Sequence, residues 1–332
     1  MDLLTWTAEG LYCSAGGFHV DPWKPVARAV FTHAHADHAR PGNQEAYAAA
    51  PSLPLLRQRL GPDAQLTALG YGAQIQWGNA RVSLHPSGHV LGSAQVRIES
   101  GGQVWVVTGD FKRAPDPTCA PFELLRADVL VLEATFGLPV YVWEEPEPVL
   151  EAIFRWWEGN RLLGRPSLLI CYALGKAQRV LAGLARFTDR PVYVHGAIET
   201  LTALYREQGV RMLPTVPVVE TARGRSFAGE LVLAPVSARG TPWLRRLGSP
   251  ATAFASGWMR LRGVRRRKGY ERGFALSDHA DWPALLRTVE ESGARRVLVT
   301  HGYTHALARY LSEVRGLTAE VVETPFEGER ED

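Results

Sequence analysis

The sequence predicts an α/β protein in which one α/β module is inserted into a second domain. The chain has 332 residues, more than a single hydrophobic core usually holds, so two domains are expected. Between residues 144 and 272, short apolar segments alternate with segments of helical spacing, which is typical of a parallel α/β arrangement. The flanking segments, 1–143 and 273–332, are expected to fold together as the other domain.

The first flanking segment contains short strands joined by turns. An apolar run covers residues 26–32, and residues 81–85 alternate between apolar and polar side chains. Residues 95–99 and 103–108 flank a Ser-Gly-Gly turn, as the arms of a hairpin do. Residues 129–132 are continuously apolar, which predicts a strand buried on both faces.

The inserted module and the last segment alternate strands with helices. In the module we expect helices at 149–161, 176–187 and 200–209, and strands at 167–172 and 191–195. In the last segment we expect strands at 274–277 and 296–300, and helices at 282–292 and 305–315.

The composition excludes several classes of protein. Apolar residues make up 46% and charged residues 21%, as in ordinary globular proteins. No apolar run approaches the roughly 20 residues that span a bilayer, and the first residues lack the features of a signal peptide. The three cysteines, Cys13, Cys119 and Cys171, lie far apart, which suits a reducing compartment. We therefore expect a cytoplasmic protein, and its net charge of +3 permits a polyanionic partner without requiring one.

The clearest chemical signal is a cluster directly after the first apolar strand. His33, His35, Asp37 and His38 fall within six residues. Two histidines two positions apart can point the same way from an extended strand end. Imidazole and carboxylate together suit zinc, manganese or iron rather than a calcium site. A surface histidine cluster without an ion is the alternative, but the preceding strand favours metal.

Three further residues extend this pattern along the chain. His89 lies in a loop between glycines, Asp110 follows the strand at 103–108, and His301 follows the strand at 296–300. Each alone is more often a hydrogen-bonded loop residue than a ligand. Together they place polar groups at the ends of apolar strands, where open α/β sheets collect their sites. We interpret the seven residues as a two-metal centre in which Asp110 bridges the ions.

These motifs resemble those of the metallo-β-lactamase fold, and over almost the whole chain the sequence resembles its β-CASP nucleases. Residues 132–137 (LEATFG) resemble motif A of that family, residues 277–281 (SDHAD) resemble motif B, and His301 resembles motif C. The resemblance implies an αββα sandwich with an inserted α/β cap, which agrees with the insertion predicted above. Phrases at 17–22, 256–259 and 274–282 are most similar to bacterial ligase-associated DNA exonucleases.

The resemblance also implies roles for individual residues. His33, His35, His89 and Asp110 would hold one ion, and Asp37, His38, Asp110 and His301 the other, with Asp21 steadying the ligands. Two Zn²⁺ or Mn²⁺ ions would activate a water that attacks phosphorus. His279 would be the general acid, and Glu133 would orient its ring and favour its charged form. With Asp37, these two form the predicted catalytic set. The alternative for His279 is a residue that caps the helix at 282–292.

A basic tract precedes motif B and predicts contact with a nucleic-acid backbone. We expect phosphate contacts from Arg260, Arg262, Arg265, Arg266, Arg267 and Lys268, with Lys176 and Ser277 contributing. A solvated charged loop is the usual alternative for such a run. For Lys176, which opens a predicted helix, a simple strand-to-helix turn is the alternative.

The predicted function is a metal-dependent DNA exonuclease that acts on single strands in repair or processing. A functional link to a DNA ligase or helicase is suggested by the family resemblance alone. An RNA-processing nuclease of the same group is the first alternative, favoured by histidine at motif C. The chain ends soon after that motif, without the extra domain of RNase J-like enzymes, which favours DNA. A small-molecule metallo-hydrolase and a non-catalytic nucleic-acid-binding scaffold are the remaining alternatives.

Overall fold

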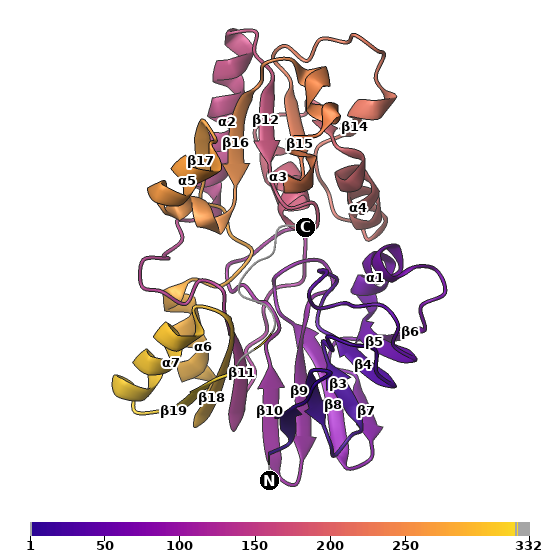
Figure 1. The fold of residues 1–332 in the computed structure, drawn as a ribbon, viewed down its shortest axis with the longest axis vertical. Coiled ribbons are helices and arrows are strands. Elements are labelled where there is room, and N and C mark those ends of the chain that lie inside the picture. The colour runs from indigo at the N-terminus through magenta and orange to yellow at the C-terminus, as the bar shows by residue number, and fades with distance from the viewer. Residues whose placement is uncertain (1, 323, 325–332) are drawn as a thin grey trace. The chain divides into compact units, whose positions relative to one another are not determined.

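The computed structural model describes residues 2–322 and residue 324, and the chain separates into two compact units (Figure 1). The sandwich unit contains the chain up to Val142 and resumes at His279. The inserted unit runs from Trp143 to Asp278. Among the described residues, no helix has the length and apolar character needed to cross a bilayer.

The sandwich unit is built from two sheets, one of six strands and one of seven. The first has the order β1-β2-β3-β4-β5-β6, and its strands are β1 (Leu4–Trp6), β2 (Leu11–Cys13), β3 (Phe18–Val20), β4 (Arg28–Phe31), β5 (Glu45–Ala49) and β6 (Leu66–Leu69). The second has the order β19-β18-β11-β10-β9-β8-β7, and its strands are β7 (Gln74–Trp77), β8 (Ala80–Pro86), β9 (Ala94–Ser100), β10 (Gln103–Val107), β11 (Val129–Ala134), β18 (Arg296–Gly302) and β19 (Thr318–Val321).

Apolar side chains of both sheets form one core between them. Phe18 and Val30 come from the first sheet, and Val96, Trp105 and Val131 come from the second. The outer face of the second sheet packs against α6 (Trp282–Ser292) and α7 (Thr304–Glu313), while α1 (Leu53–Leu60) lies beside β6. These layers, visible in Figure 1, confirm the predicted αββα sandwich.

The inserted unit is a second α/β layer structure with a wholly parallel sheet. Its strand order is β14-β13-β15-β12-β16-β17, and its strands are β12 (Ser167–Ile170), β13 (Val192–Val194), β14 (Thr215–Pro217), β15 (Leu231–Ala234), β16 (Ala251–Ala255) and β17 (Arg272–Phe274). One face packs against α2 (Pro146–Leu162), α3 (Lys176–Leu184) and α4 (Gly196–Glu207). The other face is covered by short 3₁₀ segments, η3 (Val236–Ala238), η4 (Pro242–Leu247) and η5 (Gly257–Arg260).

The structure differs from the sequence prediction at the end of the inserted unit. The sequence predicts a strand of the sandwich at residues 274–277, but the strand here is β17 (Arg272–Phe274), which pairs in parallel with β16. That pairing keeps the chain in the inserted unit to Asp278, whereas the sequence places the division after residue 272. The basic tract, for which a charged loop is the alternative, contains a short helix, α5 (Arg262–Lys268).

Candidate metal and acid–base site

The candidate residues of the sandwich unit lie at or just beyond the ends of its strands. β10, β11 and β18 are parallel neighbours, so the segments with Asp110, Glu133 and His301 meet at one edge of the sheet. The histidine cluster follows β4 in the other sheet. A hydrogen bond of 2.8 Å from the Ala94 amide to the Thr32 carbonyl links the two sheets at this edge.

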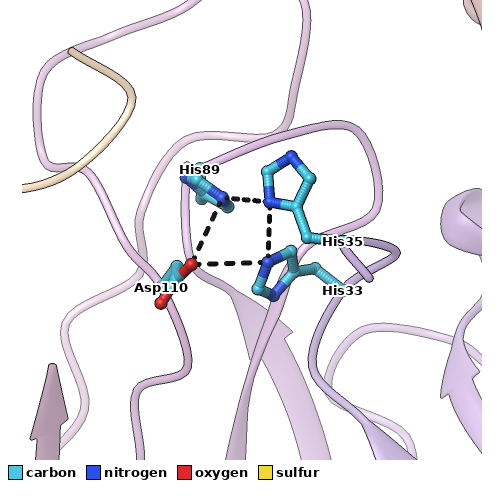
Figure 2. Close-up of side chains that lie close together, drawn as sticks. All are labelled: His33, His35, His89 and Asp110. Atoms are coloured by element: carbon cyan, nitrogen blue, oxygen red, sulfur yellow. Dashed lines mark hydrogen bonds and ion pairs between the residues drawn. The ribbon is translucent and has the colours of Figure 1, made fainter. Parts of the chain in front are cut away.

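Four of the predicted ligands converge on one point (Figure 2). His33, His35, His89 and Asp110 each offer one ligand atom, and these atoms all lie within 4.8 Å of one another. His35 Nδ1 is 3.0 Å from His33 Nε2 and 3.1 Å from His89 Nε2. Three ring nitrogens this close need protons or a cation between their lone pairs. The donor set therefore fits a divalent metal ion.

A second group of predicted ligands lies beside the first. His38 Nε2 is 3.5 Å from Asp110 Oδ2 and 3.9 Å from Asp37 Oδ2. The His38 ring stacks on that of His301, with 5.2 Å between their centroids. This buried His38 nitrogen has no hydrogen-bond partner among the residues that the structure describes, and a cavity adjoins His38, His301 and Asp21. A buried imidazole nitrogen that faces carboxylate oxygens without a hydrogen bond fits a metal ligand.

Asp110 faces both groups. Its Oδ2 atom lies 3.5 Å from His33 Nε2 and 3.7 Å from His89 Nε2, and it is the same atom that lies 3.5 Å from His38 Nε2. One carboxylate oxygen thus faces both ligand groups, which fits a carboxylate that bridges two ions.

Asp21 orients His38, a member of the second group, through a hydrogen bond from its Nδ1 atom. Its carboxylate accepts hydrogen bonds from the Thr32 amide at 2.8 Å, the Thr32 hydroxyl at 2.6 Å and His38 Nδ1 at 2.7 Å. With Nδ1 fixed, the Nε2 atom of His38 must face Asp110. Asp21 adopts a left-handed backbone conformation, with φ of 44°. The sequence predicts the role of Asp21 but not that of Thr32. The one sequence signal for Thr32 is its position directly before the histidine cluster.

Burial and charge set the protonation states of the cluster. Burial lowers the pKa of His33 well below its usual value, and the charge of His38 adds to this, so His33 is neutral and able to bind metal. Burial also opposes the charged form of His38, but Asp110, Asp37 and Asp21 raise its pKa well above the usual value. Burial alone would raise the pKa of Asp110, but nearby histidines, His38 first, hold it well below its usual range. This arrangement of carboxylates attracts a cation.

His279 and Glu133 form a buried pair beside the ligands. His279 Nδ1 is 3.1 Å from each Glu133 carboxylate oxygen. The Phe111 amide donates to one of those oxygens at 2.9 Å, and the Thr135 amide donates to the other at 3.3 Å. The His279 ring centroid lies 4.7 Å from that of His89. Glu133 therefore fixes the orientation of the His279 ring next to the candidate metal ligands.

Two other interpretations of His279 fit the structure less well. The distances alone would let Asp110, Glu133 and His279 hold an ion. However, both Glu133 oxygens already accept hydrogen bonds, which leaves that carboxylate poorly placed as a ligand. The helix-capping alternative is contradicted, because the N-cap of α6 is Asp281, whose side chain accepts from the Ala284 amide at 3.0 Å.

Glycine is required next to two candidate ligands. Gly109 precedes Asp110 with φ of 54°, and a Cβ atom there would lie 2.7 Å from the Thr32 Cβ. Gly302 follows His301 with φ of 77°, and a Cβ atom would lie 2.4 Å from the Ala134 carbonyl oxygen. Only the absence of a side chain lets these strand ends approach so closely.

The predicted nucleic-acid contacts belong to the inserted unit and do not form one set. Arg262, Arg266 and Arg267 are exposed, and the side chain of Arg260 is 41% exposed with a guanidinium nitrogen 3.7 Å from Glu144. The side chains of Arg265 and Lys268 lie outside the described part of the structure.

Lys176 and Ser277, the other two predicted phosphate contacts, are buried side chains of the inserted unit. Lys176 is fully buried, and its Nζ atom is 2.8 Å from Asp278 Oδ2. Ser277 is also buried, and its carbonyl accepts a hydrogen bond from Arg179. The ammonium of Lys176 therefore points inward to Asp278 and does not reach the surface. The sequence does not predict the importance of Arg179 and Asp278.

Two histidines outside the motifs, His85 and His195, have local hydrogen-bond partners. His85, four residues before His89, lies 3.0 Å from Ser83 Oγ and 3.0 Å from Glu123 Oε1. His195 is the N-cap of α4, where its Nδ1 accepts from the Ala197 amide at 3.1 Å. A scan for metal ligands by sequence spacing alone would have included His85.

Comparison with known proteins finds relatives whose names describe nucleic-acid enzymes. No protein-family model matches it. A probable DNA ligase of Opitutus terrae is 33% identical over 314 residues, which is 94% of this chain and 30% of that protein. The endoribonuclease YSH1 of Gibberella zeae is 27% identical over 180 residues, 50% of this chain and 21% of that protein. The chain thus spans less than a third of either relative.

A solved structure shares the fold. The crystal structure of a protein of unknown function from Enterococcus faecalis V583 matches with a TM-score of 0.60 at 14% identity. The match covers 91% of this chain and 80% of that one, so it includes both the sandwich and the inserted unit.

Proposed function

We propose, because this chain belongs to the β-CASP family of the metallo-β-lactamase fold, that it is a metal-dependent phosphodiesterase that cleaves nucleic acid. One observation carries the proposal. The four converging ligands His33, His35, His89 and Asp110 lie directly beside the buried His279–Glu133 pair. A metal site next to an oriented imidazole provides both halves of phosphodiester hydrolysis, an electrophilic centre and a proton donor.

The ligand residues would hold two ions. We assign His33, His35, His89 and Asp110 to one, and Asp37, His38, Asp110 and His301 to the other. Bound divalent ions, Zn²⁺ or Mn²⁺, supply a water that is nucleophilic at neutral pH and positive charge for the phosphate oxygens. Asp110 keeps the two sites together through its shared oxygen, and Asp21 keeps His38 turned toward that oxygen.

His279 acts on the leaving group. Its Nδ1 is held by Glu133, so the proton on Nε2 is the one available for transfer. Delivery of that proton to the departing 3′ oxygen gives a 3′ hydroxyl and leaves the phosphate on the 5′ side of the next nucleotide. Glu133 stays in place throughout, because two backbone amides hold its oxygens.

Charge is unevenly distributed along the chain, which supports a polyanionic substrate. Residues 222–272 contain 12 lysines and arginines against two acidic residues, whereas the rest of the chain contains 25 against 32. Within this arginine-rich segment, the exposed arginines include Arg223, Arg239 and Arg245, together with Arg262, Arg266 and Arg267 of α5. The Arg239 guanidinium lies 4.9 Å from the centre of the Tyr270 ring. Arginine guanidinium groups are well suited to bind the phosphates of a single strand.

Single-stranded DNA is the proposed substrate, cleaved from an end during repair or processing. A relative named as a probable DNA ligase matches almost the whole of this chain, which supports DNA. The relative named as an endoribonuclease matches half of it, so RNA processing is the second candidate. We also propose a functional link to a DNA ligase or helicase and a cytoplasmic location.

Cleavage of end-labelled strands tests this function. Protein stripped with a chelator is mixed with matched single-stranded DNA and RNA, each labelled at either end, with Mn²⁺ or Zn²⁺ added. Progressive shortening of DNA from one end, faster than of RNA, is expected, with 5′ phosphate products. Internal cuts confined to RNA would favour the second candidate. Binding of both strands without cleavage would indicate a non-catalytic protein. If the protein hydrolysed lactones or thioesters but neither nucleic acid, it would be a small-molecule hydrolase.

A further inference from the structure

A buried ionic cluster lies directly before His279 in the chain. Lys176 is 0% exposed, Asp278 3% and Arg179 4%. All three belong to the inserted unit, whereas the next residue, His279, belongs to the sandwich unit. The peptide bond between Asp278 and His279 is therefore the point at which the chain passes from one unit to the other.

The cluster fixes both the position and the rotation of the Asp278 carboxylate. Lys176 Nζ lies 2.8 Å from Oδ2, and Arg179 Nη1 lies 2.9 Å from Oδ1. The same Arg179 atom donates to the Ser277 carbonyl, so the backbone before Asp278 is held as well. Each carboxylate oxygen thus has its own cation.

Lys176 and Arg179 both lie in the first turn of α3, and hydrogen bonds of Gln178 hold that turn in place. Gln178 accepts a hydrogen bond from the Gly175 amide at 2.8 Å and donates one to the Thr202 hydroxyl at 3.0 Å. These bonds tie the start of α3 to the preceding loop and to α4. The cluster is therefore a rigid attachment point, not a pair of flexible surface charges.

The chain after Asp278 is tied just as closely. His279 bonds to Glu133, and the Ala280 amide donates to the Phe111 carbonyl at 2.7 Å. Every residue from Ser277 to Ala280 thus has a polar anchor. A shift of Asp278 must pass through one peptide unit to His279, whose ring has to be placed within a fraction of an ångström to transfer a proton.

We propose that Lys176 and Arg179 are positioning residues that act through Asp278 to hold His279 in its proton-donating geometry. This inference rests on the proposed function, since it takes His279 as the general acid. A buried ion pair is a poor source of stability, because desolvating both charges offsets their attraction. Stability alone therefore does not explain this cluster, whereas its position one residue before the proposed acid suits a role in positioning His279.

A sulfur-substituted substrate separates positioning from folding. A strand of the nucleic acid that the wild type cleaves is prepared with its scissile 3′ oxygen replaced by sulfur. A thiolate leaves without being protonated, so the general acid is not needed for this linkage. The variants are Lys176→Met and Arg179→Met, and in each the other cation of the cluster still contacts Asp278. His279→Ala is the reference for loss of the acid.

The control is Asn160→Ala, which removes a buried hydrogen bond of 2.9 Å to Ser167 Oγ elsewhere in the inserted unit. Thermal unfolding of all four variants is measured beside kcat and KM. We expect Lys176→Met and Arg179→Met to lower kcat on the oxygen strand by about 10²-fold with KM unchanged. On the sulfur strand both should match the wild type within about twofold, as His279→Ala should.

The outcomes distinguish this inference from the proposed function. Equal losses on both strands, or no loss on either, in the two positioning variants would show that the cluster has only a structural role. If the wild type cleaves but His279→Ala does not separate the two strands, the assignment of the acid is wrong and the metal-dependent activity stands. If the wild type cleaves no strand, the proposed function fails first.

Discussion

At the scale of single residues, the site separates two roles within a few ångströms. Asp110 Oδ2 faces histidines on both sides, whereas the oxygens of Glu133 accept hydrogen bonds from backbone amides and face His279. The first carboxylate is open to ions and the second is not. Because of this difference in hydrogen bonding, we assign metal binding to Asp110 and orientation of the proton donor to Glu133, although both carboxylates lie close to His279.

Removal of the His279 imidazole should slow cleavage without emptying the metal site. His279→Ala is expected to lower the rate by about 10²- to 10⁴-fold, the usual contribution of a general acid. Metal analysis by mass spectrometry should still find the wild-type content, because the proposed ligands are untouched. A variant that loses metal would instead make His279 a ligand.

Loss of Asp110, in contrast, should weaken metal binding as well as activity. Asp110→Ala removes the oxygen that lies within 3.7 Å of three ring nitrogens, so both ions should bind more weakly and activity should fall with them. Titration of the chelator-stripped protein with Zn²⁺, followed calorimetrically, measures this. Two ions bound at wild-type affinity would contradict the bridging role.

Motif-bearing residues can be predicted from the sequence because their pattern is local. The histidine cluster and Asp110 each follow an apolar strand, and that signal is visible in the chain itself. Thr32 and Arg179 cannot be identified in this way, because their roles depend on hydrogen bonds to residues outside the local pattern: Asp21 lies 11 residues from Thr32, and Asp278 lies 99 residues from Arg179. The pairing of Lys176 with Asp278 is hidden for the same reason, since a lysine at a helix start gives no sign in the sequence of a buried partner about a hundred residues away.

At the scale of elements, the site depends on how strand ends pack. The ends of β10, β11 and β18 place Asp110, Glu133 and His301 at one edge because these strands are parallel neighbours. The close approach of β18 to β11 requires Gly302, whose backbone has φ of 77°. His301 itself adopts φ of 57°, so the turn is strained at the very residue proposed as a ligand.

A side chain at residue 302 should therefore disturb both stability and metal binding. In Gly302→Ala the new Cβ would lie 2.4 Å from the Ala134 carbonyl oxygen, whereas in the control, Gly101→Ala, nothing lies within 4 Å. Both positions have positive φ, so both variants should lose about 1 kcal/mol of unfolding free energy from backbone strain. Gly302→Ala should lose about 1–3 kcal/mol more from overpacking.

Urea unfolding and zinc content measure the two effects together. Equal stability of Gly302→Ala and Gly101→Ala, with equal zinc content, would show that the approach of β18 to β11 does not position His301.

Long or strongly patterned elements are predictable from the sequence, whereas several of the short strands are not. β11 is a run of six buried residues, and α6 has a regular apolar face, so both are predicted close to their true bounds. β1, β2 and β3 have three residues each, too few to show a period, and they form only by pairing with one another and with β4. Tertiary pairing also decides β17, which lies where the sequence predicts a strand of the sandwich.

At the scale of the whole molecule, charge is segregated between parts of the chain. The arginine-rich segment 222–272 is strongly basic, and the remainder carries more acidic than basic residues. The net charge of +3 conceals this division, which is why overall composition gives no decision about the substrate. A local excess of arginine is the expected footprint of contact with a phosphate backbone.

Binding of single strands should depend on salt and on this segment. The double variant Arg266→Gln/Arg267→Gln is expected to weaken binding and to reduce the slope of log K against log salt concentration by about 0.7 for each phosphate that the variant no longer neutralises. Arg155→Gln is the matched control, because Arg155 is exposed on α2 and pairs with Glu151. Fluorescence anisotropy at several salt concentrations measures both. Equal slopes in the two variants would place the phosphate-binding groups elsewhere.

The most direct test of the central claim is a metal titration that follows ion content and cleavage together. Chelator-stripped protein is titrated with Mn²⁺, bound ions per chain are counted by native mass spectrometry, and cleavage of a labelled single strand is measured in the same samples. We predict that cleavage appears as the count approaches two ions per chain. Full activity in the stripped protein, or no cleavage of DNA or RNA with two ions bound, would contradict the account.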